Sequence, residues 1–137
     1  MKVLFLDIDA VLNRDSTKER FAGFKSLDKA LVERFLHWKN IAQPDLKIVL
    51  CSSWRIPVAF GDFMGHLRDN GIDFIDVTPH MPYANPGLEI LSWLDQHQEV
   101  TAWAVLDDCV VKGMGNRWVQ TSEREGVKDI HLARLNK

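Results

Sequence analysis

The sequence predicts one doubly wound α/β domain, in which a mostly parallel five-stranded sheet lies between two layers of helices. Two observations predict it. Short continuous apolar runs of strand length alternate with longer segments whose apolar residues recur at helical spacing. The connections between them are short, which favours strand–helix–strand units with parallel strands buried on both faces. The 137 residues, 46% of them hydrophobic, are enough for a single domain over 1–137 with its own core.

The five expected strands are short apolar runs. The first, Val-Leu-Phe-Leu, is continuous rather than alternating, which is typical of a strand covered on both faces. The expected strands are residues 3–6, 47–51, 74–77, 102–106 and 118–120.

Four helices are expected between and after these strands. Ser26 can cap the first helix, Pro57 suits the first turn of the second, and Gly71 ends it. Asn85 can cap the third helix, with Pro86 in its first position. The expected ranges are about 27–42, 57–70, 86–94 and 128–135.

Two irregular stretches remain, at residues 10–25 and 107–117, after the first and fourth strands. Ligands of open α/β sheets bind at the carboxyl ends of the strands, where both stretches lie. We therefore look for the functional site there.

The charge balance and the cysteine content exclude several classes of protein. A net charge of −2 gives no general attraction to nucleic acid or to an anionic membrane. Cys51 and Cys109 are too few for a disulfide scaffold or a structural zinc site, so reduced thiols and a cytoplasmic location are expected. No stretch approaches the roughly 20 apolar residues that a membrane helix needs.

Asp7 and Asp9 follow the first strand with one residue between them, so alternation turns both side chains to the same side. Two carboxylates this close cannot both ionise cheaply without a cation. Magnesium binds through one or two carboxylates together with water and a substrate phosphate. One aspartate can then attack phosphorus while the other moves protons. Alone, the pair also fits a merely polar strand end.

Further polar pairs end the second and fourth strands. Ser52 and Ser53 follow the second strand, where a hydroxyl can donate to a phosphoryl oxygen or simply cap the next turn. Asp107 and Asp108 end the fourth strand, and all these groups are expected to converge on one point above the sheet. Trp54 can stack on a base or wall the pocket. The candidate substrate contacts are Ser52, Ser53, Trp54 and Arg55.

These motifs resemble, in order, those of the haloacid dehalogenase (HAD) superfamily. Residues 7–13 are similar to its first motif, Asp-x-Asp-Gly-Val-Leu. Residues 48–52 are similar to its second, a hydrophobic strand ending in Ser or Thr, and residues 105–108 to its fourth, a strand ending in paired acids.

Residues 52–55, 89–94 and 118–121 resemble more narrowly a compact subgroup with little or no cap. Its members are stand-alone bacterial and phage proteins and the phosphatase domain of Swiss-army-knife RNA repair proteins. The resemblance covers nearly the whole chain and implies a three-layer, Rossmann-like fold with no substantial cap.

The resemblance also implies roles. Asp7 would form a phosphoaspartate, and Asp9 would protonate the leaving group and then activate water. Ser52, or alternatively Ser53, would hold the phosphoryl group. The implied Mg²⁺ ligands are Asp7, Asp107, Asp108 and the backbone carbonyl of Asp9.

Two departures from the family pattern stand out. Ala10 replaces the usual Gly, and alanine disfavours positive φ. The third motif normally places Lys or Arg near the start of the helix before the fourth strand, but residues 83–89 contain neither. Arg55, Lys112 and Arg117 are the candidates to replace that charge from other loops.

The segments where caps are inserted in this superfamily, 13–25 and 78–85, are too short for a packed domain, so an open site is expected. We expect a magnesium-dependent phosphomonoesterase acting on a phosphorylated small molecule or a nucleic-acid end. The alternatives are a catalytically impaired member that binds a phosphorylated ligand or partner, and a structural module whose acids only bind a cation. The sequence leaves the oligomeric state open.

Overall fold

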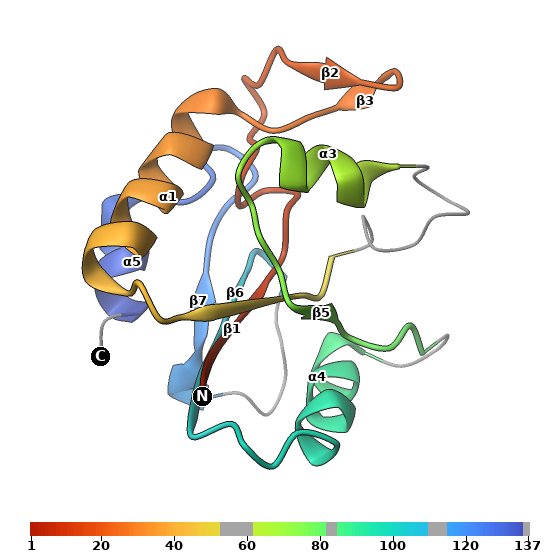
Figure 1. Ribbon diagram of the computed structural model, residues 1–137. Helices are drawn as coiled ribbons and strands as arrows, with labels where there is room; N and C mark the ends of the chain where they lie inside the picture. The colour runs from red at the N-terminus through yellow and green to blue at the C-terminus, as the bar shows by residue number, and fades with distance from the viewer. Residues whose placement is uncertain (53–61, 82–84, 110–114, 136–137) are drawn as a thin grey trace.

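The computed structural model describes residues 1–52, 62–81, 85–109 and 115–135, and it confirms the predicted fold class (Figure 1). A five-stranded, wholly parallel sheet has the order β5-β4-β1-β6-β7. Its strands are β1 (Lys2–Leu6), β4 (Lys47–Leu50), β5 (Asp76–Val77), β6 (Ala102–Asp107) and β7 (Trp118–Gln120). The helices are α1 (Lys29–Ala42), α3 (Phe63–Asp69), α4 (Pro86–Asp95), α5 (Asp129–Leu135) and the 3₁₀ turn η2 (Gly115–Arg117).

The strand order reverses beside β1. From β1 the chain passes through α1 to β4 and through α3 to β5, and then returns through α4 to β6 on the other side of β1. The carboxyl ends of β1 and β6 therefore flank the topological switch point, where open α/β sheets bind their ligands.

The two faces of the sheet bury separate cores. In β1, Val3 and Phe5 face the core closed by Ile90 and Trp93 of α4. The intervening leucines of β1 face the core that α1, α3 and α5 close. Figure 1 shows α1 and α5 side by side, with α4 across the sheet from them. Because side chains alternate, the residue after β1, Asp7, lies on the α4 side.

Helix α1 begins two residues later than Ser26 would allow. Its N-cap is Asp28, whose side chain accepts hydrogen bonds from the N–H groups of Ala30 and Leu31. The Ser26 hydroxyl is instead bonded to His66 Nε2 of α3 at 2.6 Å. The expectation that Ser26 caps this helix is therefore wrong.

Helix α4 confirms its predicted start, with Asn85 as N-cap and Pro86 in the first turn. Helix α3 is capped by Asp62, and its expected beginning at Pro57 lies outside the described residues. Strand β5 is two residues long and begins after the predicted start at Phe74. Phe74 itself is buried, and the Arg68 guanidinium lies 4.0 Å from its ring centroid.

A small hairpin interrupts the stretch 10–25, which was expected to be irregular. Its strands are β2 (Arg20–Phe21) and β3 (Phe24–Lys25). Ala22 and Gly23 connect them with φ values of 54° and 83°, the backbone of a tight two-residue hairpin turn. Phe21 stacks on His66 of α3 with ring centroids 4.1 Å apart, so the hairpin is attached to that helix.

Asp28 also anchors the loop that leads from β1 to the hairpin. Its Oδ2 atom lies 3.0 Å from Arg14 Nε and accepts a hydrogen bond from the Thr17 hydroxyl at 2.9 Å. Its own N–H donates to the Leu12 carbonyl. Burial alone would raise the pKa of Asp28, but Thr17 and Arg14 together hold it below 3.8.

No helix within the described part of the chain combines the length and the apolar character needed to cross a bilayer.

We predict that Asp28→Asn, which can still cap α1, lowers the free energy of unfolding by about 1–2 kcal/mol at neutral pH. A carboxyl with a depressed native pKa contributes stability above its unfolded-state pKa and loses it as the pH falls through its native pKa. The deficit of the variant should therefore shrink below about pH 4. Urea unfolding at a series of pH values measures this difference.

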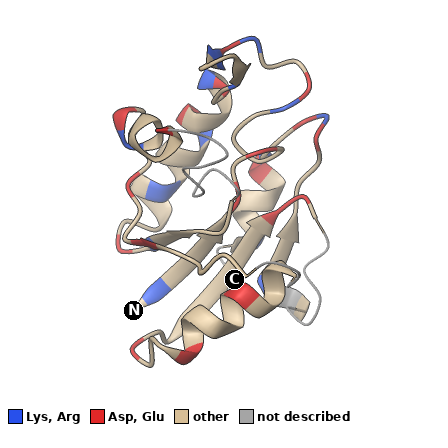
Figure 2. Cartoon of the chain, turned by 90° about the vertical axis from the view of Figure 1, so that its right-hand side faces the viewer, with Lys and Arg blue, Asp and Glu red and all other residues tan. Residues whose placement is uncertain are grey.

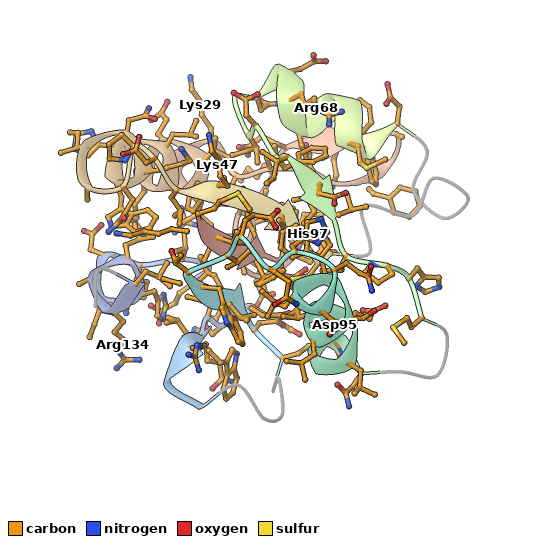
Figure 3. The ribbon with its side chains drawn as sticks, turned by 60° about the horizontal axis from the view of Figure 1, so that its bottom comes forward. Lys29, Lys47, Arg68, Asp95, His97 and Arg134 are labelled. Carbon is orange, nitrogen blue, oxygen red and sulfur yellow. The ribbon has the colours of Figure 1, made fainter. Side chains whose placement is uncertain are left out.

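Asp95→Asn provides the matched control, because this exposed carboxylate of α4 stands away from the loop anchor (Figure 3). Its unfolding free energy should follow that of the parent chain at every pH. A deficit for Asp28→Asn that stays constant into acid would contradict the predicted role of its charge.

Candidate phosphate and metal site

Asp7 and Asp107 face each other at the switch point. Leu6 and Leu106 are paired in the β1–β6 register, and Asp7 N–H continues the ladder to the Leu106 carbonyl at 3.1 Å. The next positions along both strands are therefore Asp7 and Asp107. Their carboxyl groups lie within hydrogen-bonding reach of each other.

Asp108 and Cys109 complete a cluster with Asp107. One ligand atom from each of these three residues lies within 4.8 Å of the other two. Asp107 is buried, Asp108 is half-buried and Cys109 is exposed. The Cys109 N–H donates to Asp107 Oδ1 at 3.0 Å, which fixes the turn after β6.

The crowded carboxylates perturb one another. Burial raises the pKa of Asp7 well above 3.8, and the neighbouring charge and hydrogen bond of Asp107 raise it further, with a smaller contribution from Asp108. Burial also raises the pKa of Asp107 to about 6, although hydrogen bonds from Cys109 N–H and with Asp7 oppose the shift. These groups ionise together at neutral pH only at a cost, which a cation would remove.

The donor set fits magnesium. Asp7, Asp107 and Asp108 offer hard carboxylate oxygens, which Mg²⁺ prefers. The Cys109 residue is exposed, but partial burial of its thiol and the nearby aspartates, Asp108 foremost, raise the pKa of that thiol to about 11. The thiol is therefore protonated at neutral pH in the metal-free protein, and a soft sulfur ligand is not one that Mg²⁺ prefers.

Asp9 lies at the same edge of the sheet, two residues beyond Asp7. Its side chain is exposed, and Asp9 Oδ1 accepts a hydrogen bond from Asn13 Nδ2 at 2.9 Å. The expected metal contact through its backbone carbonyl stays a prediction.

The end of β4 brings Ser52 close to this edge. Cys51 N–H donates to the Leu6 carbonyl at 3.1 Å, so the chain beyond β4 leaves the sheet beside Asp7. Ser52 is 1% exposed. The other expected substrate contacts, Ser53, Trp54 and Arg55, lie outside the described residues, as does Lys112.

Arg117, one candidate to replace the missing third-motif cation, stacks on Trp103 of β6. Its guanidinium lies 4.8 Å from the ring centroid of Trp103. Trp103 stands four residues before Asp107 on β6, roughly 13 Å away along the strand. The Arg117 guanidinium is therefore engaged with Trp103, and the other two candidates, Arg55 and Lys112, lie outside the described residues.

The start of α4, near which the third motif normally has a Lys or Arg, contains a buried glutamate instead. Glu89 is 6% exposed, and its Oε2 accepts a hydrogen bond from Met81 N–H at 2.8 Å. No Lys or Arg occurs between Met81 and Asp95 in the sequence. Glu89 instead ties the preceding loop to the helix.

Two residues near the site were not predicted. Asn13 is 2% exposed and contacts Asp9, and its only sequence signal is its place at the end of the first motif. Thr121 follows β7 and donates its N–H to the Asp107 carbonyl. Within the described part of the chain, its buried hydroxyl has no hydrogen-bond partner.

Ala10, which takes the place of the usual glycine, has a φ of 66°. The left-handed conformation costs a residue with a Cβ about 1–2 kcal/mol. The turn after Asp9 thus needs the conformation that glycine adopts freely, and alanine adopts it under strain.

Comparison with known families agrees with this geometry. Residues 3–132 match the family model described as the HAD domain in Swiss Army Knife RNA repair proteins. The chain belongs to this family. No match was found among curated proteins or among solved structures. At the level of the family, the membership indicates a phosphoesterase of the HAD type.

We predict that Asp107→Asn makes the metal-free protein more stable, by about 1 kcal/mol or more, because it removes a buried charge from a repelling cluster. The same change should reduce the stabilisation that Mg²⁺ provides, since binding to the native state raises stability by mass action. Thermal unfolding with a chelator and with Mg²⁺ measures both effects.

Asp95→Asn removes a carboxylate outside this cluster and should reproduce the parent curves in both solutions. Equal stabilisation of the parent and Asp107→Asn by Mg²⁺ would contradict the assignment of Asp107 as a ligand.

Proposed function

We propose that this protein is a magnesium-dependent phosphomonoesterase that acts on nucleotide or nucleic-acid-end phosphates through a phosphorylated Asp7. The observation that carries the proposal is the meeting of Asp7, Asp107 and Asp108 at the switch point, where burial and mutual repulsion raise the pKa values of Asp7 and Asp107 and so favour binding of a cation. Membership of a family described from RNA repair proteins supports the substrate class.

The reaction follows from the two aspartates of the first motif. A carboxylate oxygen of Asp7 attacks phosphorus in line, and the bond between phosphorus and the leaving oxygen breaks. Asp9 donates a proton to that oxygen. Asp9 then takes a proton from the water that attacks phosphorus, which releases inorganic phosphate and restores Asp7.

The surroundings of Asp7 and Asp9 suit their roles as nucleophile and as general acid and base. Asp7 is half-buried against Asp107, at the place where a phosphoryl group would meet the cation. Asp9 is exposed and held from its own loop by Asn13. Bound Mg²⁺ would lower the repulsion between Asp7 and the phosphate oxygens.

The residues proposed to bind the phosphate are those at the end of β4 and just after it, residues 52–55. Ser52, or Ser53 in its place, would donate to a phosphoryl oxygen, and Arg55 would supply the positive charge that the third motif lacks. Trp54 would wall the site or stack on a base. Figure 2 shows both charge signs interspersed over the described chain, which favours binding of a phosphorylated end over binding along a long duplex.

Cys51 and Cys109 are both free thiols, which supports a cytoplasmic location.

We also propose that residues 1–137 act as one domain.

The second candidate function is a binder of phosphorylated ligands without turnover. The buried Glu89 and the absence of a base from residue 81 to residue 95 favour it. A saturable affinity for tungstate or beryllofluoride without phosphate release would distinguish it from the enzyme.

We predict that Asp7→Asn abolishes magnesium-dependent release of phosphate from p-nitrophenyl phosphate, with a loss of about 10³-fold or more, because an amide is not a nucleophile toward phosphorus. The parent chain and Asp95→Asn should keep full activity, and a chelator should remove it. Activity of Asp7→Asn equal to that of the parent would refute the mechanism.

We predict that Arg55→Gln lowers kcat/KM for the same ester by about 10²-fold, the usual effect of losing one donor to a developing anion. Arg117→Gln is the matched control and should change kcat/KM little, because its guanidinium stacks on Trp103. Full activity of Arg55→Gln together with a loss in Lys112→Gln would give the charge to Lys112 instead.

A further inference from the structure

Asn13 places one side-chain amide at the centre of the turn that carries Asp9. Its Oδ1 accepts a hydrogen bond from Ala10 N–H at 2.8 Å. Its Nδ2 donates to Asp9 Oδ1 at 2.9 Å and to the Ser26 carbonyl at 3.1 Å. With the side chain only 2% exposed, the amide is held by protein groups rather than by water.

These three bonds determine which way the amide points. The Ala10 N–H is a donor only, so it must meet the oxygen of Asn13. The two N–H bonds of Asn13 then point to a carboxylate and a carbonyl, which both accept. Turning the amide over would oppose donor to donor and acceptor to acceptor, so a single orientation is stable.

The bond to Ser26 anchors the amide outside its own turn. Ser26 follows the hairpin, is 3% exposed, and has its hydroxyl bonded to His66 of α3. Asn13 therefore ties the Asp9 turn to the hairpin base and, through it, to α3. The grip on Asp9 does not depend on the strained backbone at Ala10 alone.

We propose that Asn13 is a positioning residue for Asp9, which orients the Asp9 carboxyl for proton transfer to the leaving oxygen. Holding Oδ1 favours one rotamer of this exposed side chain and so restricts its rotation. General acid catalysis needs the acid within hydrogen-bonding reach of the leaving oxygen, so this restriction raises the rate. The inference rests on the proposed function.

The substitution Asn13→Asp tests it most sharply. Aspartate has the shape of asparagine and can still accept from Ala10 N–H, but it replaces the fixed amide donor to Asp9 with a second carboxyl that repels the Asp9 carboxylate or competes with it for a proton. The assay compares kcat/KM for p-nitrophenyl phosphate, whose leaving group needs little protonation, with kcat/KM for glycerol phosphate, whose alkoxide leaving group needs a proton. The ratio kcat/KM reports formation of the phosphorylated enzyme, which is the step that the acid assists.

We expect Asn13→Asp to lower kcat/KM for glycerol phosphate about 10- to 100-fold more than for p-nitrophenyl phosphate, within the usual range for general acid catalysis. Thr17→Val is the control for loosening of the loop, because Thr17 anchors the same loop through Arg14 N–H and Asp28. Asn40→Asp is the control for added charge, on an exposed position of α1. Both controls should change the two esters equally.

Equal losses on both esters in Asn13→Asp would overturn the positioning role and leave a merely structural one. Hydrogen exchange of the Asn13 side-chain amide, followed by NMR, gives a second readout without turnover. Both protons should be protected in the parent chain, and Asp9→Ala should release one of them while Thr17→Val releases neither. Exchange as fast as that of the Asn40 amide in the parent would also overturn the inference.

Inactivity of the parent toward both esters would instead contradict the proposed function. The amide exchange would then decide alone whether Asn13 holds Asp9.

Discussion

Repulsion among buried and half-buried carboxylates at the carboxyl ends of β1 and β6 is the constraint on which the site depends. Asp7 and Asp107 occupy adjacent positions of one register, and Asp108 adds a third charge beside them. Such a cluster is unfavourable for a protein that has no cation to bind, because each ionised neighbour raises the cost of ionising the next. Around this cluster, the sheet is packed on both faces.

That packing comes from the two cores on either face of the sheet. Phe5 makes edge contacts with Trp93 and Trp103 on the α4 side. Leu4 and Leu6 are enclosed on the other side by α1, α3 and α5. With both faces of β1 covered, the strand cannot shift its register without exposing apolar side chains, and Asp7 is therefore kept opposite Asp107.

Much of this arrangement could be predicted because it depends on local patterns. Continuous apolar runs indicate buried parallel strands, and the strand at 118–120 and the α4 start at Asn85 were found where they were expected. The meeting of the acids at the ends of two strands could be predicted in the same way, since parallel strands end at one edge of the sheet.

What could not be predicted depends on tertiary partners. Asp28 rather than Ser26 caps α1: Arg14 and Thr17 of the preceding loop hold the Asp28 carboxylate, and the Ser26 hydroxyl is bonded to His66 of α3. The sequence does not predict the hairpin, because its strands are only two residues long and its turn has Ala22 at a positive-φ position, where glycine or asparagine is usual. The contacts of Asn13 depend on how the backbone runs from Asp9 to Ser26 at the base of the hairpin. The spacing of apolar residues in the sequence does not predict that path.

The alanine at position 10 has a consequence for attempts to engineer this protein. Glycine there would relieve the left-handed strain and would be an obvious choice for raising thermal tolerance. It would also widen the range of shapes open to the segment that presents Asp9. The strain of this turn and its restricted shape therefore have the same source, the Cβ atom of Ala10.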